Sequence, residues 1–427
     1  MTEAFPYLTA QIPPINGTAK SDYLDFFVEE IPLYQPSGVG DHVYFVVEKQ
    51  GITTLQAARE IAFALGIRPR DIGVAGQKDA RGLTRQLMSA EHQDPNRVAA
   101  LEIPRIRILA VSRHGNKLRT GHLRGNRFVL KMRDWDESRL RDVETVMAIL
   151  SDRGVPNYYG PQRFGYRGDT HAVGLLLLKG DFEAACRLIA GAPNELDTGR
   201  TLTARRLFDE GNFKEASNAW PRGFREAEVV AKGMDRFKGD AKRALLSLDK
   251  KMLGFYVSAY QSRVFNRVLG KRIAELDTVE KGDVAAKLEN GAMFLVEDED
   301  AEKPRAERFE ISATGPIFGA KMKQPDFRIL ALETGMLAEE GGTPALLSQK
   351  GVLGCRGGRR PLREKLDGVD VRTGSDDRGG YLQLSFSLPS GSYATSVLRE
   401  VFKEGLVLSE GPRSSVDSKK INIYEKL

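Results

Sequence analysis

Cysteine, histidine and long apolar runs are all scarce in this sequence of 427 residues. The two cysteines, Cys186 and Cys355, are far apart, which favours a reducing compartment and argues against a disulfide framework or a cysteine-rich zinc site. The five histidines include no His-x-x-x-His pair, so a zinc hydrolase of that kind is not expected. The longest apolar run, 173–178, is far too short to cross a membrane.

Signatures of nucleotide sites and of secretion are absent as well. There is no Gly-x-x-x-x-Gly-Lys-Ser/Thr loop, no Gly-x-Gly-x-x-Gly after a strand and no Gly-x-Ser-x-Gly elbow. Residues 1–14 lack the charged start and apolar core of a signal peptide. We therefore expect a cytoplasmic protein that needs no metal, no nucleotide cofactor and no membrane.

Length and charge give the first positive indications. A chain of this length exceeds what one hydrophobic core usually organises, so we expect two domains or one domain with a large insertion. Lys and Arg number 64 against 58 Asp and Glu, which gives a net charge of +6. The sequence pI of about 9.1 points mildly towards a polyanionic partner.

A charged turn at 76–86 follows a short apolar run and contains a single acid, Asp79. Lys78, Arg81 and Arg85 surround it, and neighbouring cations favour the ionised form of a carboxylate. Asp79 is therefore a candidate nucleophile or electrostatic anchor. Taken alone, the pattern is more often that of an ordinary loop.

The segment 105–133 contains nine Arg or Lys residues and no Asp or Glu. Near its end, apolar and basic residues alternate, which predicts a strand with one apolar and one basic face. The basic face is either solvated or follows a phosphate backbone, with Arg124 and Arg127 as the candidate contacts.

Periodicity elsewhere predicts a mixture of helices and strands. Residues 42–47 are typical of a buried strand, and a half-buried strand is predicted at 381–388. The predicted buried stripes of two helices, which end at Gly66 and Gly154, are Leu55, Ala58, Ala62 and Leu65, and Leu140, Val143, Met147 and Leu150. Directly after the second of these helices, the loop 155–165 crowds aromatics, Gly, Pro and an Asn together. This composition is poor core material but suits an unstacked base.

Five separated stretches resemble the motif series of the TruD family of pseudouridine synthases, in the family's order and over nearly the whole chain. They are 20–30, 76–86, 121–133, 157–165 and 386–400. The helix 258–269 and a turn at 314–319 also resemble family segments. The resemblance implies an α+β fold, with a mixed, largely antiparallel sheet flanked by helices and a large inserted α/β domain. We expect domain limits of 1–181, 182–360 and 361–427, the middle range being the insertion.

The resemblance also assigns roles to particular residues. Asp79 falls on the family's nucleophile, and Lys20 on a lysine that is a plausible ionic partner of it. The substrate-binding positions that it implies are Phe26, Lys78, Asn157, Tyr159 and Tyr393. Tyr23 and Leu24 depart from the family's usual Pro-Glu, and two of the tyrosines stand where Phe is more usual. These exchanges preserve the aromatic faces but leave the detailed contacts of the pocket open.

The implied reaction converts a uridine of tRNA, by family the thirteenth, to pseudouridine in a monomeric enzyme without a cofactor. Asp79 attacks either C6 of the base or the anomeric carbon, and the sequence does not choose between these routes. One rival is an RNA-binding protein without catalysis, which would have no need of a lone activated aspartate. Another is an RNA methyltransferase, whose glycine-rich cofactor loop is absent from the sequence.

Overall fold

The computed structural model describes residues 5–78, 80–349, 351 and 353–409. Contacts divide them into two compact units. The sheet unit contains residues 9–155 and 364–409, and the helical unit contains residues 5–8 and 156–363. No helix within the described ranges is long and apolar enough to span a bilayer.

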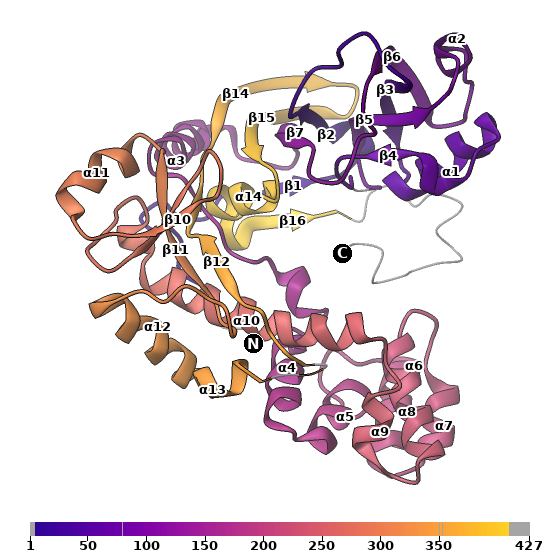
Figure 1. Ribbon diagram of the computed structural model, residues 1–427, viewed down its shortest axis with the longest axis vertical. Helices are drawn as coiled ribbons and strands as arrows, with labels where there is room; N and C mark the ends of the chain where they lie inside the picture. Colours follow the sequence, from indigo (N-terminus) through magenta and orange to yellow (C-terminus); the bar gives the residue numbers. More distant parts are fainter. Residues whose placement is uncertain (1–4, 79, 350, 352, 410–427) are drawn as a thin grey trace. The chain divides into compact units, whose positions relative to one another are not determined.

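The sheet unit is built on an eight-stranded sheet with the strand order β14-β15-β7-β2-β5-β3-β6, in which β4 also pairs with β5 (Figure 1). β2 and β5 run parallel, and the other pairings are antiparallel. The strands are β2 (Phe26–Pro32), β3 (His42–Gln50), β4 (Gly73–Val74), β5 (Leu83–Glu91), β6 (Ile106–His114), β7 (Leu123–Met132), β14 (Asp367–Asp376) and β15 (Gly379–Pro389). A separate parallel pair is formed by β1 (Gly17–Ala19) and β16 (Leu406–Leu408).

Four helices of the described residues belong to the sheet unit: α1 (Thr54–Leu65), α2 (Pro95–Ala99), α3 (Leu140–Arg153) and α14 (Ala394–Phe402). In α1 the side chain of Thr53 caps the first turn, and Gly66 ends the helix with φ of 72°. The predicted stripe of α1 is wrong at Leu55, which is 51% exposed, because Ile61 and Ala57 face the core instead. The stripe of α3 is confirmed at Val143, Met147 and Leu150.

The helical unit contains a four-stranded antiparallel sheet of order β10-β9-β11-β12. Its strands are β9 (Val284–Lys287), β10 (Met293–Leu295), β11 (Ile311–Ile317) and β12 (Gly358–Pro361). Its helices are α4 (Thr170–Lys179), α5 (Phe182–Ala190), α6 (Gly199–Asp209), α7 (Phe213–Ala219), α8 (Arg225–Arg236), α9 (Ala241–Leu245), α10 (Lys250–Lys271), α11 (Glu299–Glu307), α12 (Phe327–Glu339) and α13 (Pro344–Leu347). α10 is buried along most of its length, and it packs against α4 and β11.

Short elements complete the described chain. They are the two-residue strands β8 (Val155–Pro156) and β13 (Arg363–Glu364), and the 3-10 turns Tyr23–Asp25, Pro69–Asp71, Glu137–Arg139, Pro161–Phe164, Ile273–Glu275 and Lys403–Gly405.

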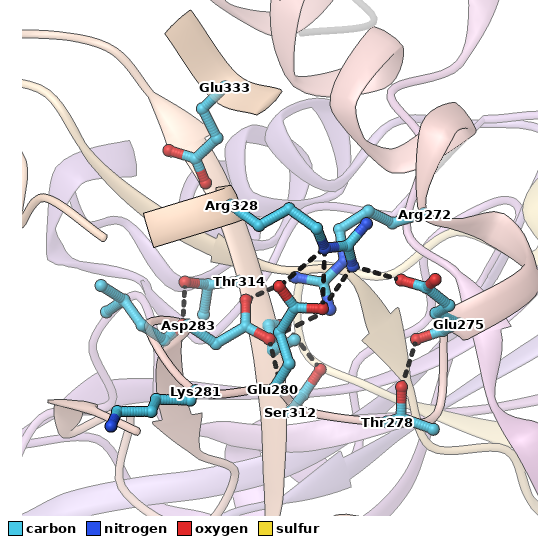
Figure 2. A network of polar contacts seen from close by, with 12 residues as sticks. Arg272, Glu275, Thr278, Glu280, Lys281, Asp283, Ser312, Thr314, Arg328 and Glu333 are labelled. Carbon is cyan, nitrogen blue, oxygen red and sulfur yellow. Dashed lines mark hydrogen bonds and ion pairs between the residues drawn. The ribbon is translucent and has the colours of Figure 1, made fainter. Parts of the chain in front are cut away.

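Buried charges stabilise the small sheet of the helical unit (Figure 2). Arg272, at the end of α10, pairs with both carboxylate oxygens of Asp283, and the two side chains are 1% and 0% exposed. Nearer the surface, Arg328 of α12 donates to Glu275 at 2.7 Å and also pairs with Glu280 (Figure 2). A buried ion keeps its charge only where its partner replaces water, so the Arg272–Asp283 pair fixes how the end of α10 meets the residue before β9. The exposed pairs of Arg328 contribute less.

The expected α+β class is confirmed, and so are the strands predicted at 42–47 and 381–388. Alternate residues of β15 are buried, as the periodicity of Leu382, Leu384 and Phe386 predicted. The turn expected at 314–319 is wrong, because its first four residues continue strand β11. The loop 155–165 also contributes to the core, since Tyr158 and Phe164 are only 5% and 7% exposed.

Candidate active site

The catalytic turn predicted around Asp79 is described on both sides of that residue, while Asp79 itself lies outside the described residues. The chain enters the turn from β4 and leaves it into β5. Thr54 accepts a hydrogen bond from the backbone N–H of Lys78 at 2.8 Å and donates its own hydroxyl to Gln86. Gln86 in turn donates to the carbonyl of Gly76 at 3.3 Å. The start of helix α1 and strand β5 therefore hold the residues just before Asp79.

Lys78 forms a buried ion pair with Glu30 of β2. Lys78 Nζ lies 3.2 Å from Glu30 Oε2, and the two side chains are 5% and 1% exposed. Asn126 of β7 accepts a further hydrogen bond from Lys78 Nζ at 2.5 Å, and the backbone N–H of Leu87 donates to Glu30 at 3.3 Å. Three strands thus fix the side chain that directly precedes Asp79.

Burial raises the pKa of Glu30 above its ordinary value and lowers the pKa of Lys78, while the opposite charge of each partner counteracts the shift of the other. Removal of either partner would leave a charge in a site that excludes water. The predicted substrate-binding role of Lys78 is not tested by this arrangement, but its ammonium already has two protein partners.

Lys20 and Phe26 contact each other at the start of β2. The ammonium of Lys20 lies 4.1 Å from the centre of the Phe26 ring, a cation–π arrangement. Lys20 has φ of 60°, a left-handed backbone conformation that is rare for a residue with a side chain. Phe26 is 5% exposed, so most of its ring surface is covered. The structure thus brings two of the predicted site residues together.

A second ionic network holds the residue before Phe26. The fully buried carboxylate of Asp25 pairs with Arg133 at 2.7 Å and with Arg378 at 3.0 Å. Arg133 also bridges to Asp376 at 2.8 Å, and Lys131 pairs with the same carboxylate. Hydrogen bonds to Asp376 and Asp25 raise the pKa of Arg133, whereas Arg133 and Lys131 lower that of Asp376. Lys131 and Arg133 therefore serve internal pairs rather than an open basic face.

Arg124 and Arg127, the predicted phosphate contacts, are both exposed on β7. Arg127 lies 4.0 Å from a carboxylate oxygen of Glu29, a distance at which an exposed pair contributes little. Tyr393, directly before α14, is 57% exposed. These side chains are accessible for binding in the structure of the sheet unit.

Asn157 and Tyr159 belong to the helical unit and have defined partners there. Asn157 is 3% exposed, donates to the carbonyl of Pro361 at 3.0 Å and accepts a hydrogen bond from Arg360. The guanidinium of Arg360 also lies over the Tyr159 ring, 4.5 Å from its centre. Asn266 of α10 bonds both the N–H and the carbonyl of Tyr159 at 2.9 Å. Arg360 therefore connects the two predicted residues of this loop.

Several residues of this arrangement have no predicted role in the sequence analysis. Glu30 and Asn126 fall inside stretches that resemble family motifs, which is the signal that could have found them. Asn266 falls inside the helix 258–269 that also resembles a family segment, and Arg360 in an arginine-rich stretch that suits either a hinge or a phosphate contact, but their partners lie 107 and 203 residues away, so the sequence does not show these contacts. Among the residues that the structure describes, no three His, Cys, Asp or Glu side chains are grouped to hold a metal ion.

Comparisons with known proteins agree with this architecture. The family model described as tRNA pseudouridine synthase D (TruD) matches residues 4–401. A protein of Geobacter metallireducens named tRNA pseudouridine synthase D is 46% identical over 93% of this chain and 98% of its own length. One of Anaeromyxobacter dehalogenans with the same name is 38% identical over 95% and 98%. A crystal structure described as a TruD of Methanosarcina mazei superposes with a TM-score of 0.83, at 26% identity over 93% of this chain and 96% of that one.

A mixed sheet matched in this way defines a pseudouridine synthase. The chain belongs to the TruD family of tRNA pseudouridine synthases. The resemblance, the fold class and the class of enzyme expected from the sequence are thereby confirmed.

Proposed function

We propose that this chain converts a uridine of tRNA to pseudouridine, with the thirteenth position as the target and Asp79 as the nucleophile. The observation that supports this most strongly is the buried Lys78–Glu30 pair with its Asn126 partner. It fixes the backbone immediately before the only acid of the turn, and a nucleophile must be held in place to act. The names of the relatives support tRNA as the substrate.

The reaction is an isomerisation, so atoms and electrons balance without a cofactor. The Asp79 carboxylate adds to C6 of the uracil or to the anomeric carbon of the ribose. The bond between N1 and the sugar breaks, the uracil turns, and C5 forms the new bond to the sugar. On the anomeric route this new bond displaces the carboxylate from the sugar, and on the C6 route the carboxylate leaves C6 afterwards; on both routes C5 loses its proton and N1 gains one.

The other residues act around this step in the proposal. In the sheet unit, Lys20 supplies positive charge, Phe26 an aromatic wall and Tyr393 an exposed ring, while Arg124 and Arg127 bind phosphates. In the helical unit, Asn157 holds its loop and Tyr159 offers a ring backed by Arg360, a surface suited to an unstacked base. We also propose that residues 182–360 form an inserted domain and that the protein acts as a monomer in the cytoplasm.

Mapping of pseudouridine in tRNA transcripts treated with the purified protein tests this function. The parent should modify one uridine, and Asp79→Asn should leave no detectable product, because the amide keeps the size but not the nucleophilic charge. Asp152→Asn, an exposed position of α3, is the matched control and should match the parent. A folded Asp79→Asn protein that works near the parental rate would overturn the assignment. Modification at another position alone would overturn only the target.

A further inference from the structure

A recess at one end of the large sheet takes no part in the proposed chemistry. It has a volume of about 810 Å³. It lies where β3 begins and where β5 and β6 end, since His42 pairs in register with both Glu91 and His114. The residues that matter for its chemistry are Tyr34, His42, Glu91, His114, Lys117 and Arg119.

The recess contains a preformed aromatic platform. The rings of Tyr34 and His114 stack with centroids 5.1 Å apart and an interplanar angle of 23°. The hydroxyl of Tyr34 lies 2.7 Å from Nδ1 of His122 and 3.4 Å from the hydroxyl of Tyr44. His114 is held as well, since its Nδ1 accepts a hydrogen bond from the backbone N–H of Ser37 at 3.2 Å. Little conformational entropy is therefore lost when a planar group stacks on the platform.

Polar groups around the platform match a nucleotide. Lys117 and Arg119 bring positive charge for a phosphate, and Arg119 is exposed. Nδ1 of His42 is buried and has no hydrogen-bond partner among the described residues, and a buried polar atom normally has one. The carboxylate of Glu91 can accept a hydrogen bond from an amino group of a base, as acids do in nucleic-acid recognition.

Along β5, the recess lies at the end opposite to Leu83, although β4, from which the chain enters the turn 76–86, pairs with Met88 and Ser89 near the recess. Leu83 pairs with Gln50 at the turn end of β5, and Glu91 pairs with His42 at the recess end. Eight residues of strand separate the two ends, which corresponds to roughly 27 Å at about 3.3–3.4 Å per residue. Arg127 pairs in register with Glu29. Arg124 lies three residues nearer the start of β7, towards Leu123 and His122, and His122 lines the recess.

We propose that this recess is a second RNA-binding site, which takes a nucleotide of the same tRNA at a distance from the modified uridine. The base stacks on the face of Tyr34 that His114 does not cover, its phosphate is bound by Arg119 and Lys117, and the exposed arginines of β7 bind the backbone in between. This inference rests on the proposed function for the identity of the RNA, but the binding that it describes does not depend on catalysis.

The test compares the affinity of two RNAs for the purified, full-length protein. One is a complete tRNA transcript, and the other is a short oligonucleotide that contains the target uridine and too few nucleotides to reach the recess. Tyr34→Ala with Arg119→Ala should weaken binding of the tRNA by about fivefold to a hundredfold, the range that loss of one stacked base gives. Binding of the oligonucleotide should change less than twofold, and the maximal rate at saturating tRNA should be kept.

Two further variants guard against a folding defect. Tyr34→Phe keeps the ring and loses the hydroxyl contacts with His122 and Tyr44, so it should bind tRNA nearly as the parent does. Arg59→Ala removes the same charge from an exposed position of α1 and should have little effect. Unchanged tRNA affinity in the double variant would overturn the proposal, and so would an equal loss for both RNAs. If the recess variants lose tRNA affinity but the parent makes no pseudouridine, the proposed function fails while the binding site stands.

Discussion

Lys78 and Glu30 form an ion pair of 3.2 Å beneath the turn that leads to Asp79, with side chains only 5% and 1% exposed. The two residues are 48 positions apart in the sequence, and Asn126 of β7 accepts a hydrogen bond from the same ammonium. A buried pair of this kind is seldom more stable than well-packed apolar residues. Its use is therefore best understood as positioning, because it specifies where the residue before Asp79 lies.

Glu30→Gln should destabilise the protein strongly and lower its activity. The amide removes the counter-charge of a buried ammonium, which typically costs about 3–5 kcal/mol of unfolding free energy. Glu29→Gln is the matched control: Glu29 is 35% exposed and has only long pairs with two arginines, so its loss should cost less than about 1 kcal/mol. Urea denaturation measures both values, and equal values for the two variants would contradict the positioning role.

A double variant separates the structural role of Lys78 from a role in binding. Glu30→Gln with Lys78→Met removes both charges, so much of the lost stability should return. If Lys78 only positions the turn, pseudouridine formation should recover in parallel with stability. If its ammonium contacts the substrate, as the sequence predicted, the double variant should fold well and remain slow. Rates under single-turnover conditions distinguish these outcomes.

Lys20 allows the charge and the backbone of one residue to be tested separately. Its φ of 60° strains any residue with a side chain, so Lys20→Gly should be more stable than Lys20→Ala by about 1 kcal/mol. Both variants lose the ammonium over Phe26 and should lose activity to the same extent. Thermal unfolding gives the stabilities and initial rates give the activities. An activity that follows stability instead of charge would remove Lys20 from the catalytic assignment.

Phe26→Leu is a better test of the aromatic wall than Phe26→Ala. Phe26 is 5% exposed, and replacement of a buried Phe by Ala costs about 3–5 kcal/mol, so Ala would confuse folding with stacking. Leu keeps the site apolar and largely filled while removing the ring. The rate should fall by about fivefold to a hundredfold without vanishing, because about 1–3 kcal/mol is lost with one stacking face. A parental rate would show that the uracil does not use this ring.

Local patterns predicted several of the helices and strands, but they did not predict the contacts that build the site. The caps at Thr53 and Gly66 and the alternation of β15 are determined by neighbouring residues, so periodicity is enough to find them. The pairing of Asp25 with Arg133 and Arg378 depends on strand register over more than 100 and 350 residues. Leu55 shows a limit of local patterns within a helix. The helical period predicts an apolar face, but it does not predict which residues at the edge of that face are buried against the core.

Arg124 and Arg127 should contribute to RNA affinity through charge alone. Replacing both with Ala should weaken binding to different RNAs to similar extents and reduce the slope of log affinity against log salt by about one unit or less per contact. Arg59→Ala with Arg141→Ala removes two exposed arginines from α1 and α3 and is the control. Filter binding over a range of salt concentrations gives the slopes. Identical slopes for the parent and the β7 variant would mean that these arginines are merely solvated.

Cys186 should make the stability of the protein depend on alkaline pH. Burial raises the pKa of its thiol from about 9 to about 12, with a smaller contribution from the nearby Glu183 carboxylate. Between these values the unfolded chain has lost the thiol proton while the folded chain retains it. Because the folded state then binds more protons, the free energy of unfolding must fall as pH rises from 9 towards 12, by at most about 1.4 kcal/mol per pH unit for this one group.

Cys186→Ala removes that contribution and therefore gives a flatter decline. The packing loss of one sulfur atom in α5 lowers stability at every pH, so the two curves should differ at pH 7 and converge as pH rises above 9. Urea denaturation of the parent and the variant between pH 7 and 10.5 measures the difference. In the folded parent, Cys186 should also react slowly with an alkylating reagent at pH 8, because the thiolate is the reactive form. Curves that stay parallel over this range would show that the thiol titrates at its ordinary pKa in the folded protein.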